Sequence, residues 1–171
     1  LGFNVSGTTS QSWLAGSSGS LAYGYFGSGA MMWGPHGNGW SDINIASATI
    51  NPGSQADCTR YFYVGNGGVA AVASRAHAVA GLTVGTLSGS VTLESTGVPL
   101  AGSTVDIYDE YGSIYTQIVT DDNGEGSVTL QPGNWRLVAT SPSYSLAEQW
   151  FAVNSSAHTT FTFLMDEDSG S

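Results

Sequence analysis

Apolar and polar residues alternate in short runs along the second half of the chain, and this period of two predicts β-strands. In one run Trp135, Leu137 and Ala139 point to one face, and Phe161 and Phe163 alternate with threonines in another. Turn residues separate the runs at even spacings, which is typical of a β-sandwich whose strands have a core face and a wet face. The predicted strands are Leu87–Leu93, Thr104–Tyr108, Ile114–Thr120, Gly126–Leu130, Trp135–Thr140, Gln149–Val153 and Thr159–Leu164.

The first half carries weaker strand patterns. Residues 1–40 are rich in Gly and Ser but are interspersed with aromatic residues, which a flexible linker would lack. Residues 43–50 predict strand structure that leads into the turn Asn51-Pro52-Gly53, and residues 59–64 predict another strand, ended by a turn at 65–68. We expect one or two more strands in residues 69–84, because Gly68, Gly81 and Gly85, together with four valines in the segment, outweigh the alanines. Almost no helix is predicted.

These elements predict an all-β chain with two parts. Residues 1–85 form a Gly/Ser-rich antiparallel β-sandwich or jelly-roll-like half, and residues 86–165 form a second β-sandwich. Residues 166–171 are an acidic tail. Apolar residues make up 41% of the chain and charged residues 9%, a balance that favours folding over intrinsic disorder.

The charge balance excludes some partners. The chain has no Lys, three Arg and a formal net charge of −10, so nucleic acid and anionic membrane surfaces would be repelled. No apolar run is long enough to span a bilayer. Because the chain starts at Leu1 rather than Met, we expect that a leader has been removed and that the protein is secreted to the cell surface.

The first residues form an alternating apolar trio. Leu1, Phe3 and Val5 would share one face of a strand. Such a strand can pair with an unpaired sheet edge of another copy and produce a head-to-tail polymer that does not close. The alternative is an ordinary first strand that pairs within its own domain.

A single cysteine and two asparagines are candidates for covalent modification. Cys58 is the only cysteine, so an intrachain disulfide is impossible; a small buried hydrophobe is the main interpretation, and an intermolecular disulfide is the alternative. Asn4 and Asn154 begin Asn-x-Ser sequons and are candidate glycosylation sites, which is compatible with export.

No catalytic, cofactor or metal site is predicted. His36, His77 and His158 are far apart in the sequence and form no ligand-spaced pair, and no Gly-x-Ser-x-Gly elbow is present. The segment that starts at Asp121 resembles an EF-hand loop, but its twelfth position is Pro132 instead of Glu, so a hairpin turn is preferred. A weak Ca²⁺ site would need Asp106, Asp109 and Glu110 together with Asp121 or Asp122; a solvated acidic edge is the preferred alternative.

Exposed aromatic residues could instead bind sugars. A stacking platform would use Trp33, Trp40 and the pair Tyr23 and Tyr25. Packing in the core or at a subunit interface is the alternative for these rings.

Turn motifs in residues 87–165 resemble those of the carboxypeptidase-regulatory-like or CnaB (prealbumin-like) β-sandwich family. Pro99 and Gly102 bend the chain before the second strand, Asn123-Gly124 suits a tight hairpin, and Pro132-Gly133 precedes the strand at Trp135. The matching stretches are Gly89-Ser90-Val91, Gly97–Gly102 with Val105-Asp106-Ile107, Thr120–Gly124 and Leu130–Leu137.

This resemblance implies a structural module of surface proteins, pili and adhesins that is usually not catalytic. It also implies a core aromatic at Trp135, which excludes this residue from a sugar-binding platform. Some members of the family form a Lys–Asn isopeptide bond, which is impossible here because the chain has no Lys. Residues 41–84 have a weaker resemblance to TasA/camelysin-like fibre proteins or to Ig-like surface domains, carried by the turn at Asn51–Ser54, the run Arg60–Val64 and the segment Gly65–Gly68.

Taken together, these features predict a homopolymeric subunit of an extracellular, pilus-like filament or biofilm fibre, assembled by strand donation through Leu1, Phe3 and Val5. A monomeric surface adhesin or carbohydrate-binding module, with glycans or other cell-surface proteins as partners, is the first alternative. A phage or virion surface protein is the second. An enzyme is not expected.

Overall fold

The fold was analysed in a computed structural model of the chain. It describes residues 7–8, 13–18, 21–27, 31–35, 41–45, 49–55, 57 and 59–167; for 7–8, 31–35 and 41–45 it describes strand pairing only. The predicted strand at residues 1–6, including Leu1, Phe3, Asn4 and Val5, lies outside these residues, as do Cys58, His36 and Trp40.

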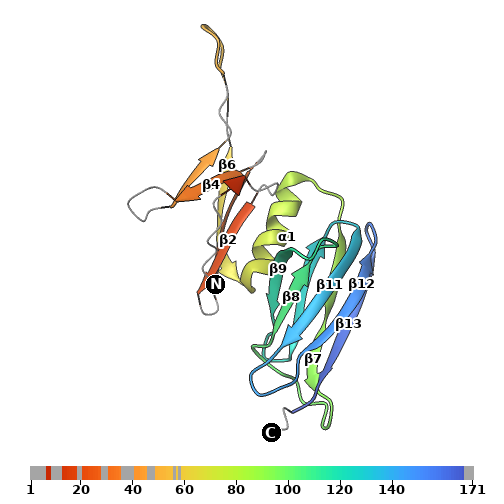
Figure 1. Ribbon diagram of the computed structural model, residues 1–171. Coiled ribbons are helices and arrows are strands. Elements are labelled where there is room, and N and C mark those ends of the chain that lie inside the picture. The colour runs from red at the N-terminus through yellow and green to blue at the C-terminus, as the bar shows by residue number, and fades with distance from the viewer. Residues whose placement is uncertain are drawn as a thin grey trace.

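The C-terminal half is a β-sandwich of two sheets (Figure 1). One sheet has the order β10-β7-β13 and pairs β7 with β13 in parallel, and the other has the antiparallel order β12-β11-β8-β9. The bounds are β7 Gly85–Leu93, β8 Thr104–Tyr108, β9 Ile114–Val119, β10 Glu125–Leu130, β11 Gly133–Thr140, β12 Ala147–Val153 and β13 His158–Met165. All seven strands predicted for this half are confirmed, with small shifts at their ends.

Alternating side chains from both sheets fill the space between them. Leu87, Ile107 and Leu137 are completely buried, and Phe161 packs against Phe163 with ring centroids 5.7 Å apart. Trp135 belongs to this core, as predicted. Burial of apolar surface of this kind is the main favourable contribution to folding.

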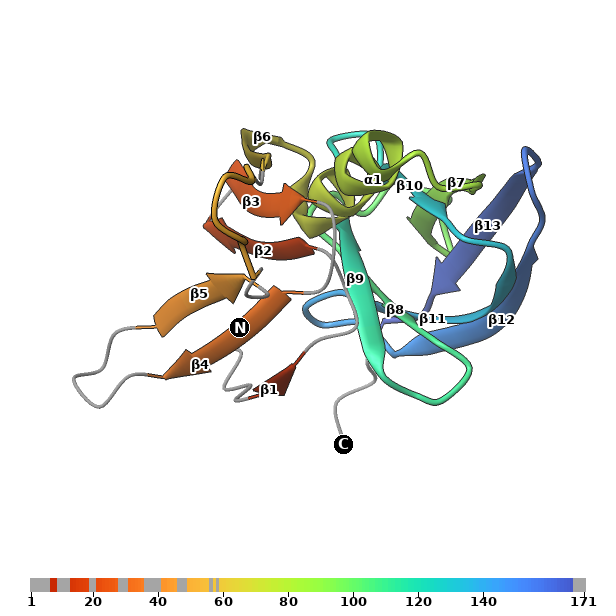
Figure 2. The same ribbon diagram turned by 90° about the horizontal axis from the view of Figure 1, so that it is seen from above.

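The N-terminal half contains two small antiparallel sheets. β2 (Trp13–Ser18), β3 (Leu21–Gly27) and β6 (Arg60–Asn66) form one in the order β2-β3-β6, and β1 (Gly7–Thr8), β4 (Met31–Pro35) and β5 (Ser41–Ile45) form the other in the order β1-β4-β5. From β6, the strands β3 and β2 follow in turn, and β4, β5 and β1 lie on the side away from β6 (Figure 2).

The prediction of strands in residues 69–84 was wrong. Gly68–Ala80 is an α-helix, α1, and six of its thirteen residues are alanine, the strongest helix former. Its apolar residues Val69, Val72, Ala73 and Ala76 recur at the spacing of a helix face. The glycines taken as strand signals mark the helix ends: Gly81 caps it with φ 63°, and the following amide, that of Leu82, donates to the His77 carbonyl.

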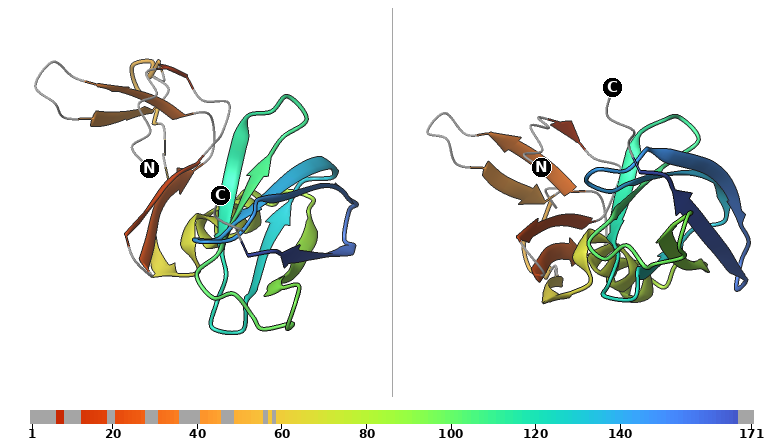
Figure 3. Two further views of the ribbon diagram at one scale, coloured as in Figure 1. Left: turned by 60° about the horizontal axis from the view of Figure 1, so that its bottom comes forward. Right: turned by 90° about the horizontal axis from the view of Figure 1, so that it is seen from below.

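Helix α1 lies between the N-terminal sheet and the sandwich, as the views in Figure 3 show. One side, with Val72, Ala73 and Ala76, packs under β2 and β3. Another side carries Ala70 into the sandwich core beside β9 and β10, which end their respective sheets. The helix therefore covers the edge of the sandwich at which β9 and β10 end their sheets. Its other side supports the β2-β3-β6 sheet.

Several turns differ from their predicted roles. The turn Asn51–Ser54 is present, with the Ser54 amide donating to the Asn51 carbonyl, but Thr49 and Ile50 before it are not in a strand. Gly65 and Asn66 are the last residues of β6, and Gly67 and Gly68 with positive φ lead into the helix.

The turn at Asn123-Gly124 is not a hairpin, because it links β9 and β10, which belong to different sheets. The Asp121 carboxylate holds it by accepting hydrogen bonds from the Asn123 and Glu125 amides, and only the glycine of the pair has positive φ, at 71°. The Pro132-Gly133 turn also joins strands of different sheets. The turn residues therefore predict chain reversals correctly, but not which strands pair.

Helix docking depends on Gly24 of β3. A Cβ atom built there would lie 2.0 Å from Cγ1 of Val72, so Gly24→Ala forces the sheet away from the helix. We predict a loss of about 1–3 kcal/mol in the free energy of unfolding, measured by chemical denaturation. In a Val72→Ala background, where the opposing methyl groups are absent, adding Gly24→Ala should lower the free energy of unfolding by less than it does in the wild type. Equal stability of Gly24→Ala and wild type would contradict this packing.

Candidate assembly surface

The outer face of the β2-β3-β6 sheet, on the side away from α1, carries exposed apolar side chains. Cross-strand partners share a face, and here Tyr23 lies opposite Val64 and Tyr25 lies opposite Phe62. Phe62 is 69% exposed and Val64 60% exposed. We call the set Leu14, Leu21, Tyr23, Tyr25, Phe62 and Val64 the outer apolar face; Leu14 and Tyr25 are half-buried, and the other four are exposed.

β6 ends its sheet. It pairs with β3 on one side, and no other strand among the described residues pairs with its second side. A strand edge of this kind presents backbone N–H and C=O groups that can pair with another chain. The β6 edge and the outer apolar face therefore adjoin in one region of the N-terminal half.

Charge is distributed unevenly between the halves. Eleven of the thirteen acidic residues lie in residues 86–171, whereas residues 1–41 contain no Asp, Glu, Lys or Arg. The sandwich half therefore repels another copy, and the N-terminal half can approach one without that cost.

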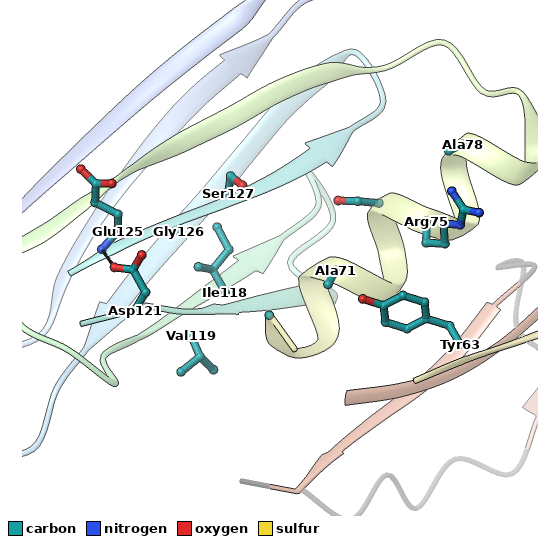
Figure 4. Close-up of a pocket in the computed structure, with 12 residues that line it drawn as sticks. Tyr63, Ala71, Arg75, Ala78, Ile118, Val119, Asp121, Glu125, Gly126 and Ser127 are labelled. Carbon is teal, nitrogen blue, oxygen red and sulfur yellow. Dashed lines mark hydrogen bonds between the residues drawn. The ribbon is translucent and has the colours of Figure 1, made fainter. Parts of the chain in front are cut away.

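A groove of about 540 Å³ runs between β6, the exposed side of α1 and the start of β10. Figure 4 shows Ala71, Arg75 and Ala78 on the helix, with the ring of Tyr63 beside them. Ile118 and Val119 form part of the opposite side. The polar residues that line the groove are Ser74, Arg75, Asp121, Glu125 and Ser127.

Tyr115 connects the three parts of the structure, and we call its contacts the Tyr115 hub. Its ring centroid lies 5.7 Å from that of Trp13 on β2, 5.0 Å from Trp135 in the sandwich core and 6.0 Å from His77 on α1. Its hydroxyl is 2.6 Å from Nε2 of His77. Burial raises the pKa of Tyr115, so the phenol stays protonated as a hydrogen-bonding group.

His77 itself is 1% exposed. Its Nδ1 lies 3.3 Å from the Thr129 hydroxyl on β10, and the Thr129 amide donates to the Ser74 hydroxyl at 3.0 Å. Burial lowers the pKa of His77, while a backbone hydrogen bond at Thr129 acts in the opposite direction. A neutral, hydrogen-bonded imidazole therefore fastens the helix to the sandwich.

The remaining candidate residues are dispersed. Tyr23 and Tyr25 lie on the outer apolar face. Trp33 lies in β4, for which the structure describes the strand pairing and not the side chains. Asn154 is exposed in the turn between β12 and β13, as a glycosylation site requires. The His158 Nε2 lies 2.6 Å from the Ser88 hydroxyl, far along the chain from His77.

Two of the acidic residues considered for Ca²⁺ accept hydrogen bonds within the sandwich. Asp106 accepts a hydrogen bond from the Gln117 side chain, and Asp109 accepts two from the amides of Tyr111 and Ser113. Among the described residues no group of three or more His, Cys, Asp or Glu could hold a metal ion. None of the described helices has the length and apolar character to cross a membrane.

Sequence reasoning missed the Tyr115 hub and the groove. The helical spacing of Ala70, Ser74 and His77 was the available signal, because it places these three residues on one side of a helix. Nothing in the sequence indicates that this side meets Tyr115, 38 residues further on.

Residues 86–166 match the family model of the carboxypeptidase regulatory-like domain. The resemblance predicted from the turn motifs of this half is thereby confirmed. The match does not reach residues 41–84, whose resemblance to TasA/camelysin-like or Ig-like proteins stays a prediction. No curated protein sequence matches the chain.

Solved structures with a similar fold belong to different classes of protein. The 3-chlorocatechol 1,2-dioxygenase of Rhodococcus opacus 1CP is 12% identical over 50% of this chain and 60% of that chain (TM-score 0.40). The 5-hydroxyisourate hydrolase of Klebsiella pneumoniae is 26% identical over 50% and 94% (TM-score 0.40). The shaft pilin SpaA of Lactobacillus rhamnosus GG is 13% identical over 53% and 49% (TM-score 0.43). This chain thus spans less than two thirds of the dioxygenase and the pilin.

The buried His77 predicts a pH dependence of stability. The unfolded chain, with an ordinary histidine pKa of 6.5, binds a proton that the folded chain excludes at its lowered pKa. The free energy of unfolding therefore falls as the pH drops below about 6.5 and levels off below the folded pKa. His77→Gln should lack this contribution between pH 7 and 5 in denaturant titrations.

His158→Gln is the matched control, because it replaces an exposed histidine and leaves His77 in place. The free energy of unfolding of this variant should depend on pH as that of the wild type does. Parallel pH profiles for wild type and His77→Gln would show that His77 is not buried as a neutral group.

Proposed function

Because residues 86–166 form a β-sandwich that matches the carboxypeptidase regulatory-like domain, we propose that the chain is a structural subunit of an extracellular filament, in which copies exchange a β-strand. The observation that carries the proposal is the edge of β6, with which no second strand among the described residues pairs, beside an exposed apolar face in the half of the chain that has little charge. Such an edge is a template for pairing with a second chain.

The donor is the segment of residues 1–6. Leu1, Phe3 and Val5 share one strand face and carry no charge. Burying each of these side chains contributes about 1.5–3 kcal/mol before the entropic cost of ordering the strand, and backbone pairing adds to it. A contact between a donor on one face and an acceptor on another is heterologous, so it generates an open polymer.

The charge distribution supports this arrangement. Polymerisation through the sandwich halves would bring together two surfaces that each hold most of the negative charge of the chain. Contacts through the N-terminal half leave the acidic sandwiches separated and solvated along the filament. The secreted, cell-surface location belongs to the same proposal.

The donor is tested with two matched variants. Leu1→Ser/Phe3→Ser/Val5→Ser removes the apolar face, and Gly2→Ser/Asn4→Ser changes the opposite face of the same strand. We predict that wild type and the second variant form filaments in electron microscopy and that the first stays monomeric by light scattering. Filaments of unchanged length and yield from the first variant would refute donation by these side chains.

Glycan binding is the second candidate function, favoured by a row of side chains across β12, β11 and β8. Trp150, 52% exposed, lies opposite Arg136, which forms an ion pair with Glu148 at 3.1 Å and lies over the ring of Tyr108. An exposed indole beside fixed polar groups is suited to stacking on a sugar ring. This row differs from the platform predicted from Trp33, Trp40, Tyr23 and Tyr25.

Trp150→Ala should abolish retention on a glycan array if this candidate holds, whereas Leu164→Ala, a change at a similarly exposed apolar residue of β13, should not. Absence of glycan binding by the wild-type chain would eliminate the second candidate.

A further inference from the structure

We infer that the groove over α1 is the acceptor site: it receives residues 1–6 of a second copy as a fourth strand, paired with the edge of β6. This inference rests on the proposed function, because it names the place at which an exchanged strand would bind. Its evidence is the position of the groove relative to the sheet and the helix.

Among the described residues, the β2-β3-β6 sheet covers only part of the surface of α1. β2 and β3 cover Val72, Ala73 and Ala76, and β6, the last strand, reaches the groove through Tyr63. The next strand of an extended sheet would lie about 4.8 Å beyond β6. Because Tyr63 of β6 lines the same groove as Ala71 and Ala78 of α1 (Figure 4), a strand added beyond β6 would lie beside that side of the helix.

The dimensions of donor and acceptor agree. A helix of 13 residues is about 20 Å long at 1.5 Å per residue. Five residues of extended chain span about 17 Å at about 3.4 Å per residue. A strand that contains Leu1, Phe3 and Val5 would therefore follow the exposed side of α1 over most of its length.

The lining of the groove suits alternating apolar side chains. Ala71 and Ala78 are small and leave room above the helix, and Ile118 and Val119 offer apolar surface on the sandwich side. Every second side chain of an added strand points toward the helix. Leu1, Phe3 and Val5 would thus enter the groove, and the polar Asn4 and Ser6 would face solvent.

A second copy is a better source of this strand than the chain itself. The segment precedes β1, and Figure 2 shows β1 on the opposite side of the N-terminal half from β6, with β2 and β3 between them. The segment has no charged side chain, so its side chains can enter a groove lined by Arg75, Asp121 and Glu125 without placing like charges together.

Ala78→Trp tests the acceptor by filling the groove with an indole. Ala78 is exposed on α1, so the substitution should not unfold the chain, which the thermal midpoint verifies. Ala80→Trp is the matched control, because Ala80 is exposed on the same helix but does not line the groove. We expect loss of filaments in electron microscopy for Ala78→Trp and wild-type filaments for Ala80→Trp.

Mixing two defective chains gives the decisive result. The triple variant Leu1→Ser/Phe3→Ser/Val5→Ser lacks a donor but keeps the groove, and Ala78→Trp keeps the donor but lacks the groove. Each alone should remain monomeric, and a 1:1 mixture should form a heterodimer, but no filaments, in light scattering coupled to size exclusion.

The outcomes separate this inference from the proposed function. Filaments formed by folded Ala78→Trp would overturn the acceptor site and leave donation in place elsewhere. Two monomeric variants that fail to form the heterodimer would also overturn the groove as an intermolecular acceptor. Filaments formed by the donor-defective variant, or a wild-type chain that never polymerises, would overturn both.

Discussion

The structure depends on the docking of α1 through the Tyr115 hub. One side of the helix covers the edge of the sandwich at β9 and β10, and another supports the β2-β3-β6 sheet. Tyr115 touches Trp13, Trp135 and His77, so one ring belongs to the packing of both halves. Because burial favours the neutral imidazole and leaves its ring nitrogens in need of hydrogen-bond partners, the contacts of His77 with Tyr115 and Thr129 also fix the orientation of the helix.

This docking positions the surfaces on which the proposed assembly depends. The helix supports β6 at the border of the groove, and Ala71 and Ala78 line this groove together with Tyr63 of β6. The N-terminal sheet is small, and three strands gain stability when they pack on a helix. A strand added beside β6 would extend the β2-β3-β6 sheet, and α1 would support it as it supports the other strands.

The charge pattern gives the two halves different roles in this account. The acidic sandwich keeps separate copies apart and solvated, and the nearly uncharged N-terminal half supplies the donor strand and the β6 edge, with part of the sandwich lining the groove beside them. A single chain can therefore be soluble before assembly and still polymerise through one region of its surface.

The sandwich could be predicted from the sequence because its determinants are local. Turn residues such as Gly102 and Gly124 separate strands whose alternating faces are visible in the sequence. The helix was missed because Gly and Val were given more weight than the alanines and their helical spacing. Strand pairing and the Tyr115 hub could not be predicted, since they join residues whose proximity is set by tertiary packing.

The most direct measurement is a cryo-electron microscopy map of the assembled protein, resolved well enough to trace the backbone. The account predicts an extended segment with the side chains of Leu1, Phe3 and Val5 beside β6 and over α1, continuous with a neighbouring subunit. A map in which the edge of β6 is bare, or in which residues 1–6 pair within their own subunit, would contradict it.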